Sequence, residues 1–199
     1  MKFNHRLNFF INDKQYTFRT LLPEDVSPLY VQSLNEERTF IENVPELIDI
    51  NSQKEYISSI LSSKHDSICG LFLENELIGT AGIQNLLGKD QVIVVDGYTN
   101  NSTIGILVLS KAIRGIGYGK TLVWAGCLLA NKCYGINIFE ACMFKTNPPS
   151  LKAFLACGFS ITKENLKSYN VELNIKNLNP PGFIDVPSIH FLSEKNNNA

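Results

Sequence analysis

A glycine-rich segment just past the midpoint of the chain restricts its fold more than any other feature. Residues 112–121 read AIRGIGYGKT and place Gly115, Gly117 and Gly119 between an apolar run and a stretch with helical spacing. Amides at the start of a helix have no partner inside that helix, and glycine lets them approach an anion closely. The segment is therefore typical of a loop that holds a phosphate group at the beginning of a helix.

Two common phosphate-binding motifs do not fit this segment. The nucleotide P-loop, GxxxxGK[ST], would need a glycine where the chain has Arg114. The Rossmann fingerprint GxGxxG would need its third glycine at Lys120 or Leu122. The pattern that does fit is [Q/R]xxGxG, formed by Arg114, Gly117 and Gly119. The spacing of the glycines therefore favours a different anion-binding loop.

Length, charge and hydropathy limit the fold and the partners. The 199 residues are 44% hydrophobic and carry a net charge of −1, which suits one compact domain. Without an excess of basic residues, we expect no nucleic-acid partner. Apolar runs stay below the roughly 18 residues of a membrane span, and the N-terminus lacks the apolar core of a signal peptide. We therefore expect a cytoplasmic protein with no membrane partner.

Cysteine and histidine spacing gives no sign of a metal site. The five cysteines form no CxxC pair, and the three histidines are scattered singly along the chain. Cysteines of this kind are usually small buried hydrophobic side chains in a reducing compartment. We therefore expect neither disulfides nor a bound metal.

Periodicity predicts a mixed α/β (α+β) domain in the order β-α-α-β-β-β-α-β-α-β. Residues 67–110 contain short β-rich runs separated by turn residues, which is typical of an antiparallel meander. Residues 179–199 contain three prolines and an asparagine run. We therefore expect one domain at residues 1–178, followed by a C-terminal tail at 179–199 with little regular structure.

A second motif follows the glycine loop by about 30 residues. Residues 147–159, NPPSLKAFLACGF, match the pattern NxxSxxx[Y/F]xxxGF on a short predicted helix. With [Q/R]xxGxG before it, the chain resembles the Gcn5-related N-acetyltransferases (GNAT) over roughly residues 16–178. Within that family, residues 26–42 look similar to a segment of ribosomal-protein and amino-sugar acetyltransferases. The resemblance implies one mostly antiparallel sheet of about six to seven strands with about four helices, splayed at the cofactor strand.

The resemblance also implies acetyl-CoA as co-substrate. Its pyrophosphate would bind to the backbone of the glycine loop, and its pantetheine arm would pair with exposed backbone of the preceding strand. Asn147 would contact the arm. The alternative role for this residue is helix capping alone. The residues implied to bind the cofactor are Leu107, Val108, Leu109, Arg114, Gly115, Ile116, Gly117, Tyr118, Gly119, Lys120, Asn147, Ser150 and Lys152.

The catalytic residues are less evident. Phe154 stands where many relatives carry a tyrosine thought to protonate the leaving thiolate, and phenylalanine has no O–H to donate. The candidates for a general base are Glu140, on the predicted strand at residues 136–144, and Asp96 before the cofactor strand. The Glu140 carboxylate could be paired in a structural network or could lie in the catalytic cleft, and the sequence favours neither. Asp96 also fits an ordinary turn.

The sequence therefore predicts an N-acetyltransferase that transfers acetyl from acetyl-CoA to a primary amine by direct attack in a ternary complex. A small-molecule amine such as an amino sugar is the first acceptor class. A ribosomal-type protein N-terminus is the second, since residues 35–46 carry four glutamates that could form an acidic groove or only a solvated helix face. A CoA-binding module without catalysis is a third alternative. The oligomeric state cannot be read from the sequence, and a homodimer is one option.

Overall fold

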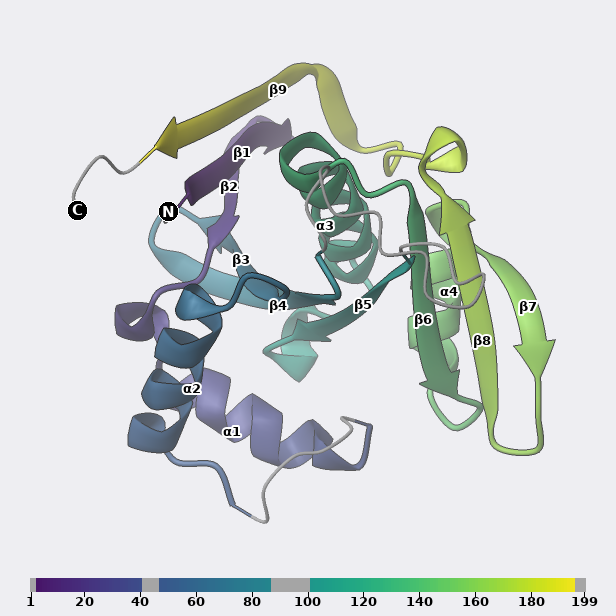
Figure 1. The fold of residues 1–199 in the computed structure, drawn as a ribbon, viewed down its shortest axis with the longest axis horizontal. Coiled ribbons are helices and arrows are strands. Elements are labelled where there is room, and N and C mark those ends of the chain that lie inside the picture. Colours follow the sequence, from purple (N-terminus) through teal and green to yellow (C-terminus); the bar gives the residue numbers. More distant parts are fainter. Residues whose placement is uncertain (1–2, 41–46, 87–100, 196–199) are drawn as a thin grey trace.

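The computed structural model describes residues 3–40, 47–86 and 101–195 (Figure 1). The helices are α1 (Pro28–Glu37), α2 (Ile50–Ser62), α3 (Tyr118–Tyr134) and α4 (Pro148–Ala156), with short 3-10 helices η1 (Pro23–Asp25), η2 (Arg38–Phe40), η3 (Lys111–Ile113) and η4 (Ile175–Asn177). The strands are β1 (Phe3–Ile11), β2 (Lys14–Thr20), β3 (Ser67–Leu73), β4 (Glu76–Gln84), β5 (Asn101–Val108), β6 (Ile138–Phe144), β7 (Ser160–Glu164), β8 (Ser168–Asn174) and β9 (Ile184–Lys195).

The predicted fold class is confirmed. The described strands form one sheet in the order β7-β8-β6-β5-β4-β3-β2-β1-β9, and each neighbouring pair is antiparallel except β5 and β6. Helices cover both faces in the two groups visible in Figure 1. One apolar cluster lies between the sheet and α3 with α4, and a second lies between the sheet and α1 with α2. Side chains that alternate along the strands supply both clusters.

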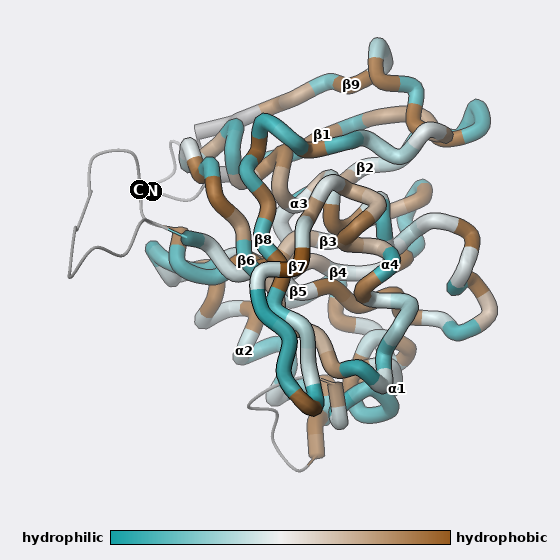
Figure 2. Tube along the Cα trace, turned by 90° about the vertical axis from the view of Figure 1, so that its right-hand side faces the viewer, coloured by the Kyte–Doolittle hydropathy of each residue, from teal (hydrophilic) through white to brown (hydrophobic). Residues whose placement is uncertain are grey.

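The structure contains three strands that the sequence did not predict, namely β1, β7 and β9. The expectation of little regular structure at residues 179–199 is wrong for Ile184–Lys195, because β9 pairs antiparallel with β1 and lies alongside it (Figure 2). Proline cannot donate to a ladder, but Pro187 falls where the register shifts between Asn8 and Phe10. There the Ser188 hydroxyl accepts from the Phe10 N–H at 3.0 Å. The last segment is therefore part of the sheet.

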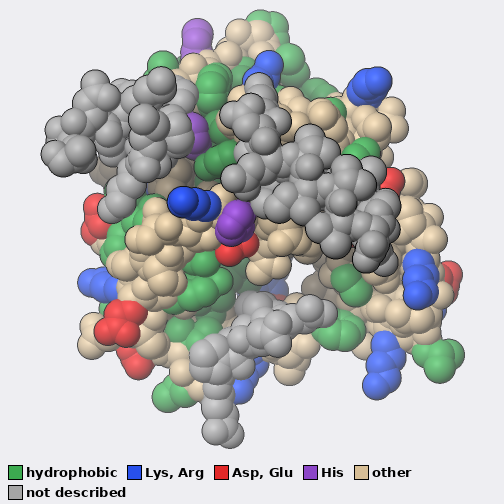
Figure 3. Space-filling model, viewed as in Figure 1, with side chains coloured by type: hydrophobic (Ala, Val, Ile, Leu, Met, Phe, Trp, Pro, Cys, Tyr) green, Lys and Arg blue, Asp and Glu red, His purple; other side chains and the backbone are tan. Residues whose placement is uncertain are grey.

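The sheet opens between its two parallel strands. β5 and β6 are paired only from Asn101↔Ile138 to Thr103↔Glu140, whereas β4 and β5 stay in register as far as Gly79↔Val108. Beyond Thr103, β5 therefore diverges from β6, and the space-filling view shows an opening at this place (Figure 3). The predicted splay at the cofactor strand is present.

Within the described ranges, no helix combines the length and apolarity needed to cross a bilayer. Asp96, and the predicted strand before position 100, lie outside the described residues.

Candidate active site: a glycine loop beside the open sheet

The glycine loop leads directly into α3, as the sequence predicted. Gly115 and Gly117 have φ angles of +85° and +114°, which a side chain would make costly. The first helical hydrogen bond runs from the Thr121 N–H to the Gly117 carbonyl at 3.1 Å. In the described part of the chain, the amides of residues 118–120 have no acceptor. Three donors at the positive end of a 17-residue helix are therefore open to an anion.

The side chain of Arg114 points back to the helix on the other face of the sheet. Its Nη1 donates to Glu37 Oε1 at 2.9 Å, and its Nη2 donates to the Val108 carbonyl at 3.1 Å. Arg114 was expected to bind the cofactor, but its guanidinium joins α1 to the end of β5. A contribution of Arg114 to cofactor binding would therefore come from its backbone or through Val108.

Two further contacts join α1 to the same region. The Ser33 hydroxyl donates to the Leu109 carbonyl at 2.8 Å, and Lys111 pairs with Glu36 at 2.9 Å. The hydrogen bond from Lys111 lowers the pKa of Glu36. Of the four glutamates in residues 35–46, Glu36 and Glu37 thus pair with cations of this chain, and the other two lie outside the described residues. This pairing weakens the expectation of an acidic groove for a basic protein.

The backbone of β5 offers the open side a donor at Val108. The Leu109 N–H donates to the Ile78 carbonyl at 3.1 Å and so faces β4. Residues alternate in direction along an antiparallel pair, so Leu107 faces β4 as well. Val108, between them, directs its N–H and carbonyl toward the diverging β6. Of the three residues expected to pair with the pantetheine arm, only Val108 directs its backbone away from β4, and its carbonyl already accepts from Arg114, which leaves the N–H for the opening.

The second motif lies beside the first. Asn147 caps α4, and its side-chain oxygen accepts from the Ser150 N–H at 3.4 Å. A Cβ built at Gly119 would lie 3.5 Å from the Ala153 Cβ, so α4 packs close against the first turn of α3. The Cys157 thiol donates to the Lys120 carbonyl at 3.3 Å. The two motifs, far apart in sequence, therefore meet at one place, with Ser150 half-buried and Lys152 exposed on α4.

Phe154 belongs to the core. It is 2% exposed and meets Phe159 edge to face, with ring centroids 4.9 Å apart. This matches the expectation that phenylalanine at this position can only pack.

Glu140 lies where the two parallel strands separate. It is the last β6 residue in register with β5, opposite Thr103, and its side chain is on the exposed face of the strand. Its Oε1 accepts from the Asn101 Nδ2 at 2.5 Å. The side chain thus has a structural partner and is also exposed at the point where β5 and β6 begin to separate. Cys142 is exposed on this same face, whereas Cys69, Cys127 and Cys157 are buried as expected.

One contact near the loop had no clear sequence signal. A Cβ built at Gly117 would lie 2.5 Å from Cζ and 2.7 Å from Cε1 of Phe183, so this ring lies directly on the glycine. The residue after Gly117 has a long-range contact too, since the Tyr118 and Tyr16 hydroxyls are 2.9 Å apart. Burial and this hydrogen bond raise the pKa of Tyr16. The only hint of Phe183 in the sequence is an aromatic residue after a rigid Pro-Pro-Gly turn.

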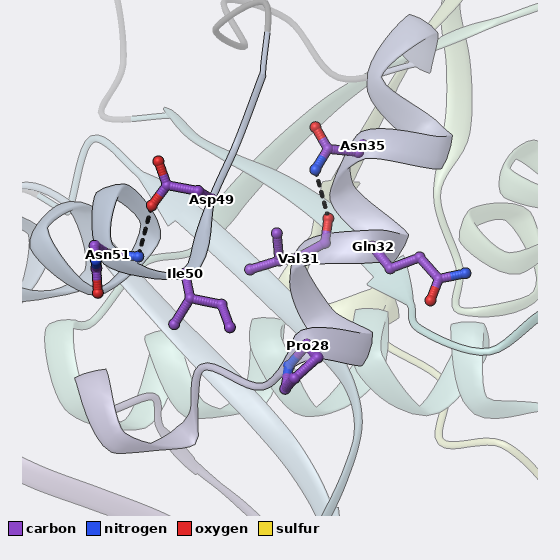
Figure 4. A pocket seen from close by; sticks show the side chains of 7 residues that line it. All are labelled: Pro28, Val31, Gln32, Asn35, Asp49, Ile50 and Asn51. Carbon is purple, nitrogen blue, oxygen red and sulfur yellow. Dashed lines mark hydrogen bonds between the residues drawn. The ribbon is translucent and has the colours of Figure 1, made fainter.

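A hollow of about 530 Å³ lies elsewhere, between α1 and α2 (Figure 4). Its polar side chains already serve the local structure. Asn35 donates to the carbonyls of Val31 and Ile48, and Asp49 accepts from the amides of Asn51 and Ser52 at the start of α2. We therefore do not regard this hollow as the active site. Among the residues that the structure describes, no group of His, Cys, Asp or Glu side chains could hold a metal ion.

Comparison with known proteins agrees with this geometry. The family model of the acetyltransferase (GNAT) domain matches residues 15–160. The chain therefore belongs to the GNAT acetyltransferases, and it is an acetyl-CoA-dependent N-acetyltransferase. No curated protein sequence gives a match.

Solved structures share the fold at low identity. RimJ of Mycobacterium smegmatis in complex with CoA-disulfide has a TM-score of 0.68 at 14% identity, over 86% of this chain and 88% of that one. Spermidine N-acetyltransferase of Vibrio cholerae in complex with CoA and spermine has a TM-score of 0.65 at 10% identity, over 81% of this chain and 96% of that one. AAC(6')-Ib in complex with ribostamycin and coenzyme A has a TM-score of 0.64 at 18% identity, over 81% of this chain and 94% of that one.

Proposed function

We propose that the pyrophosphate of acetyl-CoA binds at the first turn of α3 and that its thioester lies in the opening between β5 and β6. The observation that carries this proposal is the set of three unpartnered amides at residues 118–120, beside the place where the sheet opens. A dianionic group there would satisfy these donors and interact favourably with the helix dipole. Lys120, exposed in the same turn, adds a positive charge.

The acceptor amine attacks the thioester carbonyl directly. The new C–N bond forms as the C–S bond breaks, the amine loses a proton, and the CoA thiolate leaves and takes up a proton. The Val108 N–H would polarise the carbonyl, and a preorganised donor of this kind is typically worth about 3–4 kcal/mol in the transition state. Holding both substrates in line supplies more, up to roughly 7–11 kcal/mol. Glu140 would take the amine proton from the exposed face of β6, and Asp96 is the second candidate for this role.

We propose a small molecule with one or more primary amines, such as an amino sugar, as the acceptor. The pairing of Glu36 and Glu37 with Lys111 and Arg114 supports this class over a basic protein N-terminus, because these acids are not free to recognise one. Fold neighbours act on or bind such compounds, spermine and ribostamycin among them. A ribosomal-type protein N-terminus is the alternative acceptor class.

Charge reversal at the two ends of α3 tests the cofactor site. Lys120→Glu puts a carboxylate beside the proposed pyrophosphate, and we expect at least a tenfold rise in the Kd for CoA by titration calorimetry. The same change stabilises the free protein slightly, because acidic residues suit a helix N-terminus. Lys132→Glu, at the other end of α3, is the control and should destabilise slightly while leaving CoA affinity unchanged. Wild-type affinity in Lys120→Glu would overturn the placement of the pyrophosphate.

A turnover screen over amino sugars, polyamines and basic peptides then identifies the acceptor.

A further inference from the structure

Phe183 belongs to the short segment between η4 and β9, far along the chain from the loop that it touches. Its ring lies on Gly117, within 2.5–2.7 Å of the position that a Cβ would take there. It is partly buried against the main apolar core. A side chain at Gly117 would therefore displace Phe183 before it met a cofactor, so this glycine is needed by the fold as well as by the loop.

The segment that carries Phe183 is anchored on both sides. Before it, the Asn179 N–H donates to the Cys157 carbonyl at 3.0 Å, next to Gly158, where a Cβ would meet the Asn177 carbonyl oxygen. After it, the Ile184 N–H donates to the Pro181 carbonyl at 2.9 Å, and β9 continues along β1. Figure 1 shows this path from β8, past α3, to the edge of the sheet. Phe183 is thus held in place by α4 and by the sheet, independently of any ligand.

The ring contacts a loop that must keep an uncommon backbone shape. Gly115 and Gly117 are both in the left-handed region, and glycine in a free loop would sample many other conformations. A phenyl ring carries no nitrogen or oxygen acceptor, and the amides of residues 118–120 have no acceptor in the described part of the chain, so Phe183 can restrain Gly117 while these donors keep their capacity for an anion. A loop that is already ordered loses less conformational entropy when its ligand binds.

We propose that Phe183 is a positioning residue of the acetyl-CoA site, which holds Gly117 so that the first amides of α3 face the pyrophosphate. This inference rests on the proposed pyrophosphate site. It extends that site to the C-terminal segment, beyond residue 160, where the match to the family model ends. The chain after residue 178 is then a working part of cofactor binding.

Substitution of two aromatic residues of the C-terminal segment tests this role. Phe183→Ala should raise the Kd for CoA, and the KM for acetyl-CoA, about five- to tenfold, with the KM for the acceptor unchanged. Phe183→Leu keeps an apolar side chain against Gly117 and should recover most of the affinity. Phe191→Ala is the matched control, since Phe191 packs on β9 beside His5 and away from the loop. Phe191→Ala should leave the Kd for CoA unchanged. Thermal unfolding of every variant shows whether the fold is retained.

Three results would overturn the inference. Unchanged affinity in Phe183→Ala would mean that the loop holds its shape without the ring, and tighter binding would mean that the ring blocks the site. An equal loss in Phe191→Ala would point to general destabilisation of the C-terminal segment. Failure of the pyrophosphate site itself is recognised separately, because Lys120→Glu would then bind CoA as well as the wild type does.

Discussion

The contact between Arg114 and Glu37 gives a prediction whose size follows from the structure. The guanidinium makes one bond to Glu37 at 2.9 Å and one to the Val108 carbonyl at 3.1 Å. The Arg114 side chain is 35% exposed and the Glu37 side chain 15%, so water screens the pair in part. We therefore assign the ion pair about 1 kcal/mol, at the upper end for surface pairs. The bond to Val108 adds about 1 kcal/mol.

These values define a double-mutant cycle in the free energy of unfolding. Glu37→Gln should cost about 1 kcal/mol, because only the ion pair is lost. Arg114→Gln should cost about 2 kcal/mol, because the bond to Val108 is lost as well. The double variant should cost no more than Arg114→Gln alone, which corresponds to a coupling energy of about 1 kcal/mol. Urea unfolding of the four proteins at low and moderate salt measures this coupling.

The same cycle separates two roles for Arg114 in cofactor binding. If the guanidinium only positions Val108, either single variant should raise the KM for acetyl-CoA by a few-fold, and a coupling of 1 kcal/mol corresponds to about fivefold. Lys111→Gln is the control, because Lys111 forms a more exposed ion pair beside the same loop. A coupling energy within error of zero would refute the stability argument. A collapse of CoA binding in Arg114→Gln, with Glu37→Gln unaffected, would show that the guanidinium binds the cofactor directly.

Two further predictions concern pH. Glu140→Gln should depress kcat most at low pH, where the acceptor amine needs a base, and less at high pH, where the amine is already neutral. Glu172→Gln, opposite Glu140 on β8, is the control. A loss of kcat in Glu140→Gln that does not depend on pH would indicate a structural role. Burial lowers the pKa of His5 from its ordinary 6.5, so the unfolded chain binds a proton that the folded one does not. Stability should therefore fall as pH drops below about 6.5, by the linkage between proton binding and folding. His5→Gln should flatten this part of the curve in thermal unfolding from pH 7.5 to 5, and an unchanged slope would exclude His5 as its source.

Local signals in the sequence were sufficient for much of the candidate site. Glycine spacing located the loop and the start of the helix that follows it, which begins at Tyr118. The Asn-Pro-Pro start of α4 identified its cap, because capping depends on a side chain and an amide only three residues apart. The fold class followed from periodicity in the same way. Such signals are readable because the interacting groups are neighbours along the chain.

Other features depended on contacts between distant segments. β9 was missed because Pro180 and Pro181 just before it and Pro187 within it are typical of a loop. Its pairing with β1 places Ser188 beside Phe10, at a separation of 178 residues. Arg114 and Glu37 are 77 residues apart, and neither residue type identifies the other as its partner. Assignment of Leu107 and Leu109 to the pantetheine arm was too broad, since the direction of each amide depends on which neighbour β5 pairs with.

The sequence alone determined that this chain has a glycine loop at the start of a helix, in a mixed α+β domain that resembles the GNAT acetyltransferases. Backbone shape at glycine and capping at helix ends are short-range properties, so they can be read from spacing. Only the tertiary structure decided that β5 and β6 separate after Thr103, that Val108 faces the opening, and that Phe183 lies on Gly117. These features arise because packing and strand pairing bring together residues whose proximity no local pattern encodes.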